Sequence, residues 1–247
     1  MSEVQTLARG LRVLELLAET EDGLSSTELA EVLEVDKSSM SRLMNTLVSY
    51  RFAERDEITR RYYLGTYIQE LGRRAGQHGL LRDLVEPHLQ RLSALTSENA
   101  HVAVYASSHA LTIADVPSTE PLRVVSEVGR RVPLHCSAIG KCLLAFAEVP
   151  LPVNLARYTS RTIVSVPQLE LQLEQIRYQN YALDDEELTL GVRGLAVPLR
   201  NREGRTIATI GLSGPSVRLT MEKIPELADL LIKSAQDISK ELGFQLD

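Results

Sequence analysis

The first part of this chain of 247 residues has the hydrophobic spacing of helices, and the later part alternates between strand and helix patterns. Between residues 4 and 48, apolar side chains recur every three or four positions, which places them on one face of a helix. This spacing predicts three helices separated by short polar segments. The first should end near Gly23, and its apolar face contains Val4, Leu7, Ala8, Leu11, Leu14, Leu17 and Ala18.

The second and third predicted helices follow each other closely, as in a helix-turn-helix motif. Ser25 and Glu28 have the spacing of a capping box, so the second helix should begin directly after Ser25. Asp36 is the expected N-cap of the third helix. The second helix is predicted to bury Leu29, Ala30, Val32 and Leu33, and the third Met40, Leu43, Met44, Leu47 and Val48.

The opposite face of the third helix carries hydroxyl, amide and basic side chains, which reach base edges and phosphates from a major groove. Residues 52–65 then predict a short hairpin, the wing of a winged helix. Taken alone, each element also fits an ordinary solvated surface, but their order favours DNA binding. The predicted contacts are Lys37, Ser38, Ser39, Ser41, Arg42 and Asn45 in the major groove and Arg60 and Arg61 at the DNA backbone.

The distribution of charge is compatible with this interpretation although the formal net charge is -6. Residues 1–36 carry two basic and nine acidic side chains, whereas residues 37–74 carry eight basic and four acidic ones. DNA responds to the local surface that touches it, because each contact neutralises an individual phosphate. An acidic total therefore does not exclude a DNA-binding protein.

A polar segment, residues 65–79, has glycines at both ends and predicts a linker helix between two domains. The remaining chain alternates strand and helix patterns, which indicates an α/β domain. The expected elements are strands at 101–107 and 110–116, a strand and turn at 123–134, helices at 137–147, 167–183 and 224–242, and a hairpin at 194–214 that turns at Gly204.

Composition narrows the class of protein further. The hydrophobic content of 44% is enough for two modest cores. The sequence has no run of eighteen apolar residues and no signal-peptide pattern, so we expect a cytoplasmic protein that does not enter a membrane. The two cysteines, Cys136 and Cys142, are expected to be small core residues in a reducing compartment.

The chain resembles the IclR family of bacterial transcriptional regulators over nearly its whole length. The resemblance is carried by "LARGLRVLELLAE", "LSSTELAEVLEVDKSSMSRLMNTL", "RRYYLG", "LHCSAIGKCLLAF", "YALDDEELTLGVRGLAVPLR" and "TIGLSGPSVRL". It implies an α+β protein with a winged helix-turn-helix DNA-binding domain at 1–64, a linker helix at 65–79 and a GAF-like α/β effector-binding domain at 80–247. The chain departs from the family where Glu34 and Arg51 replace glycines.

The resemblance also implies a function. A repressor of this kind binds a pseudo-palindromic operator in double-stranded DNA as a homodimer or a dimer of dimers, and a small organic-acid effector controls its affinity for DNA. Matched to the family's motif, the effector pocket contains Ala138, Ile139, Asp184, Gly194, Gly211 and Ser213, with apolar walls from Val124, Val132 and Val192.

The start of the helix at 137–147 favours a carboxylate, because free N–H groups and the helix dipole meet there, although no arginine is obviously aimed at it. The same groups also fit a simple helix cap. Family members that bind very small keto acids carry cysteine and serine where this chain has Gly194 and Gly211. We therefore expect a larger sugar acid or aromatic acid in preference to glyoxylate or pyruvate.

A metal-dependent sensor or a small-molecule enzyme is the alternative. His101, His109, Asp115, His135 and Cys136 could contribute ligands, and the acidic stretch "LDDEE" offers carboxylates. However, the chain has no paired histidine motif, no CxxC and no nucleophile elbow. We therefore expect no catalytic residues, no metal and no cofactor.

Overall fold

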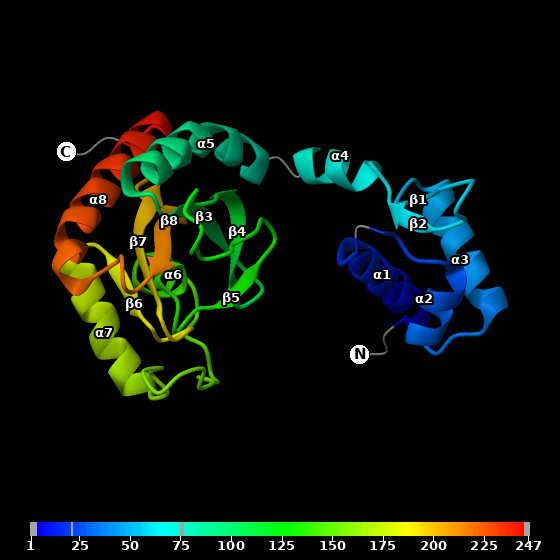
Figure 1. Cartoon of the computed structure of the whole chain (residues 1–247), viewed down its shortest axis with the longest axis horizontal. Helices are drawn as coiled ribbons and strands as arrows, with labels where there is room; N and C mark the ends of the chain where they lie inside the picture. Colours follow the sequence, from blue (N-terminus) through cyan, green and yellow to red (C-terminus); the bar gives the residue numbers. More distant parts are fainter. Residues whose placement is uncertain (1–3, 21, 75–76, 245–247) are drawn as a thin grey trace. The chain divides into compact units, whose positions relative to one another are not determined.

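Two compact units, residues 1–79 and 80–247, make up the chain in the computed structural model (Figure 1). The structure describes residues 4–20, 22–74 and 77–244. Within these ranges, no helix combines the length and the apolar character that crossing a bilayer requires.

The first unit contains a helix-turn-helix motif followed by a small hairpin. Its elements are α1 (Gln5–Ala18), α2 (Ser26–Val32), α3 (Lys37–Ser49), β1 (Ala53–Arg55), β2 (Tyr62–Leu64) and α4 (Tyr67–Arg74). The predicted capping box at Ser25 and Glu28 is confirmed, and the Asp36 carboxylate accepts a hydrogen bond from the Ser39 N–H. Met40 and Met44 are fully buried, which confirms the predicted apolar face of α3.

The prediction of the buried face of α1 was partly wrong. Gly10, Val13 and Leu17 are the buried residues of this helix. The predicted stripe includes Val4, Leu7 and Leu11, which are 67%, 61% and 56% exposed, and Val32 on α2 is also exposed. The apolar stripe of α1 is wider than its contact with the rest of the unit, so periodicity alone could not tell which edge is covered.

The described residues of the predicted linker helix at 65–79 are mostly helical, and the helix that starts at Gln77 continues well beyond residue 79. The structure has α4 up to Arg74 and a further helix, α5 (Gln77–Thr96), whereas residues 75 and 76 lie outside the described part of the chain. Most of α5 was not predicted. It contains Pro87, a residue that normally argues against a helix interior.

A six-stranded antiparallel sheet forms the centre of the second unit. The strands lie in the order β5 (Arg131–Pro133), β4 (His109–Val116), β3 (Asn99–Ala106), β8 (Thr206–Pro215), β7 (Val192–Arg200) and β6 (Ala182–Asp185). The predicted adjacent strands and the hairpin turning at Gly204 are confirmed. Two predictions of element bounds were wrong. Residues 123–134 contain only the short strand β5, and the helix predicted at 167–183 ends at Gln179 and is followed by β6.

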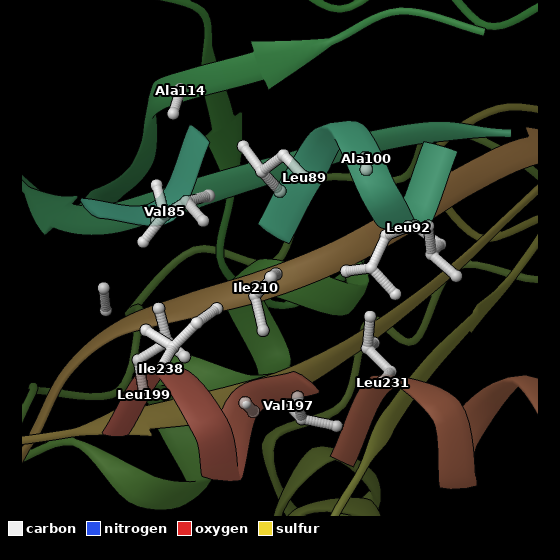
Figure 2. Packing of buried hydrophobic residues seen from close by; sticks show 14 of the residues in the cluster. Val85, Leu89, Leu92, Ala100, Ala114, Val197, Leu199, Ile210, Leu231 and Ile238 are labelled. Carbon is white, nitrogen blue, oxygen red and sulfur yellow. The ribbon is translucent and has the colours of Figure 1, made fainter. Parts of the chain in front are cut away.

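Helices cover both faces of this sheet. On one face, α5 and α8 (Ile224–Glu241), which follows the short 3₁₀ helix Met221–Lys223, pack their apolar side chains against the strands (Figure 2). On the other face, α6 (Ala138–Phe146) and α7 (Val166–Gln179) bury a second apolar cluster. This arrangement confirms the expected α+β fold with a GAF-like α/β second domain.

Candidate functional site

Helix α3 presents a polar face that the rest of its unit leaves uncovered. Lys37, Ser38, Ser41, Arg42 and Asn45 are exposed, while Ser39 is half-buried. The Asp36 carboxylate accepts hydrogen bonds from the Ser38 hydroxyl at 2.6 Å and from the Ser39 N–H at 2.9 Å. These bonds lower the pKa of Asp36. The start of α3 is therefore held rigidly, and the longer side chains that follow it are free to reach a partner.

The predicted wing consists of β1, β2 and the tip between them. Asp56 organises the tip, because its carboxylate accepts hydrogen bonds from the N–H groups of Ile58 and Thr59. The exposed Arg60 side chain forms a solvent-exposed ion pair with Glu57, at 3.4 Å. A pair of this kind contributes little stability, so the guanidinium can exchange it for a phosphate.

Arg61 has a different environment from the one predicted for it. Its Nε donates hydrogen bonds to the carbonyl oxygens of Asp22 and Gly23, and its Nη2 lies 3.1 Å from a carboxylate oxygen of Glu28. The side chain thus ties the wing to the loop before α2 and to α2 itself. These intradomain contacts indicate a structural role for Arg61, whereas its contact with the DNA backbone stays a prediction.

In the second unit, a cavity of about 550 Å³ lies between the sheet and the start of α6. At the cavity, one row of register partners crosses four neighbouring strands. Asn99 pairs with Ser213, Ser213 with Gly194, and Gly194 with Asp184. A neighbouring row pairs His101 with Gly211. The register thus brings residues from four strands onto one face.

Eight of the nine predicted pocket residues line this cavity. They are Val124, Val132, Ala138, Ile139, Asp184, Val192, Gly194 and Ser213. Gly211 does not line it. A Cβ atom at Gly211 would lie 2.7 Å from the carbonyl oxygen of Leu195 and 3.2 Å from Nε2 of His101, so the expected free space is already filled. At Gly194, by contrast, a Cβ would make only ordinary contacts, the nearest at 3.4 Å from the Ala138 Cβ.

The start of α6 offers two unpaired donors to the cavity. The Ser137 hydroxyl caps the helix by accepting from the Gly140 N–H, whereas no acceptor for the N–H groups of Ala138 and Ile139 is found in the described part of the chain. Sequence reasoning missed three arginines in the cavity lining, Arg123, Arg130 and Arg193. Arg193 already makes an ion pair with Asp185 at 2.6 Å, and Arg123 and Arg130 donate hydrogen bonds to backbone carbonyl oxygens.

A buried group of charges adjoins the cavity. Lys141 on α6 is completely buried and donates a hydrogen bond to Glu187, whose second carboxylate oxygen has no partner among the described residues. Asp184 accepts a hydrogen bond from the Glu187 N–H at 2.8 Å. Burial raises the pKa of Asp184 to about 7. This carboxyl group is therefore partly protonated near neutral pH and can donate as well as accept.

Several further polar residues of the cavity were not predicted as effector contacts, among them His101 and Thr112. His101 was considered only as a metal ligand. Its Nδ1 lies 3.3 Å from Oδ1 of Asn99, and the Ser213 hydroxyl donates to the same oxygen at 3.2 Å. Burial, aided by the positive charge of Arg130, lowers the pKa of His101 to about 4.

The histidines considered for a metal site are dispersed. His109 contacts the carbonyl oxygen of Ser107, and Nε2 of His135 lies 2.9 Å from the carbonyl oxygen of Ala156. Across residues 4–20, 22–74 and 77–244, no three His, Cys, Asp or Glu side chains are placed so that they could hold a metal ion. Cys136 and Cys142 are both buried free thiols.

Comparison with known proteins identifies the relatives of the chain. Residues 6–57 match the IclR helix-turn-helix domain, and residues 75–240 match the C-terminal domain of the bacterial transcriptional regulator IclR. The HTH-type transcriptional regulator BhcR of Paracoccus denitrificans is 32% identical over 96% of this chain and 86% of its own length. The transcriptional repressor IclR of Escherichia coli is 31% identical over 98% and 91%, respectively.

A solved structure shares the fold of the whole chain. It is an IclR homolog from Microbacterium hydrocarbonoxydans in complex with 4-hydroxybenzoate, with 25% identity, coverage of 96% of this chain and 98% of the other, and a TM-score of 0.83. Both parts of the chain therefore have the same family assignment. The chain belongs to the IclR family and is a DNA-binding transcriptional regulator.

Proposed function

We propose that the chain is a repressor whose affinity for its operator is controlled by a small organic acid bound in the cavity of the second unit. The observation that carries this proposal is the cavity at the start of α6, where two N–H groups without an acceptor among the described residues favour a carboxylate. The relationship to the E. coli repressor IclR supports the direction of control. We assign DNA binding to residues 1–64, the link to 65–79 and effector binding to 80–247.

We propose that α3 reads the operator through Lys37, Ser38, Ser39, Ser41, Arg42 and Asn45, and that Arg60 contacts the backbone. Replacing Arg42 by alanine should weaken specific binding by about 1–3 kcal/mol if the guanidinium reads a guanine. Arg42→Lys keeps the charge and serves as the control for base reading. Quantitative footprinting on the operator tests the assignment, and a protein without sequence preference at moderate salt would contradict it.

The control by an effector requires that acid binding changes the affinity for DNA. A thermal-shift screen of organic acids on the full chain identifies binders, because a ligand specific for the folded state raises the melting temperature. Gel retardation with and without a saturating acid then measures the coupling. An acid that binds tightly but leaves operator affinity unchanged would refute the proposed control.

The preferred acid is proposed to be larger than pyruvate. Gly194 leaves room beside the start of α6, and the cavity of about 550 Å³ exceeds the needs of a three-carbon acid. The 4-hydroxybenzoate complex of the Microbacterium homolog supports an aromatic acid of this size. Gly211 does not contribute to this argument, because neighbouring atoms fill the space above it. Calorimetry that detects tight binding of pyruvate or glyoxylate alone would contradict the size class.

We further propose a homodimer, or a pair of dimers, working in the cytoplasm where its DNA target lies, without enzymatic activity. A two-fold dimer presents two copies of α3, which a pseudo-palindromic operator requires. The exposed apolar edge of α1, formed by Val4, Leu7 and Leu11, offers a surface that a second copy can cover. Analytical ultracentrifugation measures the oligomeric state, and a monomer at micromolar concentration would contradict this part of the proposal.

A further inference from the structure

His101 is the one histidine in the cavity lining among the described residues. It lies on β3 and is 7% exposed. Its two ring nitrogens have different surroundings, and the hydrogen bonds around Asn99 determine which nitrogen carries the proton.

The side chain of Asn99 can be oriented from its partners. Its Nδ2 donates to Oδ1 of Asp115 at 2.9 Å and to the carbonyl oxygen of Val116 at 3.2 Å. Both partners are acceptors, so the amide nitrogen must face them and Oδ1 must face His101. Since Oδ1 can only accept, Nδ1 of His101 must carry the proton.

The consequence is that Nε2 of His101 has a free lone pair. Burial keeps the ring neutral at physiological pH, because it lowers the pKa to about 4. No hydrogen-bond donor to Nε2 is found in the described part of the chain. The atom is also not fully enclosed by protein, so a ligand can reach it. A neutral acceptor is therefore left open at the cavity.

Gly211 helps to keep this acceptor free. It is the register partner of His101 on β8, and a Cβ at this position would lie 3.2 Å from Nε2. A serine there would bring a hydroxyl group close to the ring nitrogen. With glycine, none of the described residues donates to Nε2, and a ligand must provide a donor if Nε2 is to be satisfied once water is displaced.

We propose that His101 accepts a hydrogen bond from a hydroxyl group of the effector, so that the cavity selects hydroxy acids over acids of the same size that lack a hydroxyl. This inference rests on the proposed control by an organic acid and specifies the class of acid. The carboxylate and the hydroxyl are recognised by different groups, namely the N–H groups of α6 and the ring of His101. A carboxylate oxygen cannot replace the hydroxyl, because it brings no proton to Nε2.

Three pairs of acids test the proposal by calorimetry on the full chain. They are 4-hydroxybenzoate and benzoate, mandelate and phenylacetate, and gluconate and hexanoate. In at least one pair we expect the hydroxy acid to bind about tenfold more tightly, since its partner leaves a buried acceptor unpaired. In His101→Phe this preference should fall to about twofold or less, while the matched control His109→Phe, at a histidine outside the cavity, should retain it.

A second measurement does not depend on any variant folding. Long-range proton–nitrogen NMR of the histidine-labelled wild-type protein identifies which ring nitrogen of His101 is protonated and whether Nε2 responds to the hydroxy acid. A proton on Nε2 in the free protein would overturn the proposal, and so would a preference that survives in His101→Phe. Acids that bind without any preference for the hydroxyl overturn this inference alone, whereas failure of all six acids to bind overturns the proposed effector class as well.

Discussion

The two units of this chain place their charged side chains in opposite ways. In the first unit, Lys37, Arg42 and Arg60 are exposed and keep at most weak contacts with the rest of the protein. In the second unit, Lys141, Asp184 and Glu187 are buried next to the cavity. The first set lies on the proposed DNA-binding surface, whereas the second set is buried in the core and only Asp184 of it lines the cavity.

The difference shows what each charge contributes. An exposed side chain interacts with high-dielectric solvent, so its removal changes recognition of a partner more than folding. A buried charge depends on its partner, and removing that partner leaves a charge that water cannot reach. Stability measurements and DNA-binding measurements should therefore separate the two sets of residues.

The largest expected effect comes from Lys141. Replacing it by methionine leaves Glu187 buried and unpaired, which should lower the free energy of unfolding of the second unit by about 3–5 kcal/mol. Urea unfolding followed by far-UV circular dichroism measures the loss. The double substitution Lys141→Met with Glu187→Leu removes both charges and should recover most of it. Equal destabilisation of the single and double variants would show that packing, rather than charge, dominates at this position.

A smaller effect, on the order of a few kcal/mol, is expected from the titration of Asp184. Its pKa rises from an ordinary 3.8 to about 7 in the folded protein, so between these values the folded state holds a proton that the unfolded state has lost. The free energy of unfolding should therefore decrease as pH rises from about 4 to about 7 and level off above. Asp184→Asn cannot titrate and should flatten this slope. Parallel pH profiles of the two proteins would contradict the prediction.

Arg61 and Arg60 allow a structural and an exposed charge to be compared within a single hairpin. Arg61→Ala removes three hydrogen bonds to the loop before α2 and to Glu28, so it should lower the stability of the first unit by about 1 kcal/mol. Arg60→Ala should leave stability unchanged and reduce the salt dependence of DNA binding by about one phosphate contact. Thermal unfolding and salt titrations of operator binding separate the two effects. If Arg61→Ala changes the salt dependence and leaves stability unaltered, the structural role is wrong.

The smallest effect concerns the backbone at the two positions where the family has glycine. Glu34 has φ of 50° and Arg51 has φ of 62°, a left-handed conformation that disfavours side chains with a Cβ. Glu34→Gly should stabilise the first unit by about 0.5 kcal/mol. Arg51→Gly should gain less, because the Arg51 guanidinium lies 4.7 Å from the Tyr67 ring centroid and this contact is lost. Differential scanning calorimetry measures both shifts, and destabilisation by Glu34→Gly would contradict the expectation.

Most of the first unit could be predicted from the sequence because its signals are local. The capping box at Ser25, the N-cap at Asp36 and the apolar face of α3 each depend on residues within two helical turns. The polar face proposed to read DNA lies on that same helix. What periodicity left open was the covered edge of α1 and the partner of Arg61, since both depend on elements elsewhere in the unit.

In the second unit, less of the binding site could be predicted from the sequence than in the first. The sequence by itself determined most strands and helices, the hairpin at Gly204 and, through the family motif, eight residues of the cavity. The tertiary structure alone decided that Gly211 is covered, that three arginines line the cavity and that Nδ1 of His101 lies beside Oδ1 of Asn99. Asn99 and Ser213 are 114 positions apart, and they meet because the register of the sheet aligns their strands. Hydrogen bonds between strands set that register over the whole unit, so no short stretch of sequence contains it.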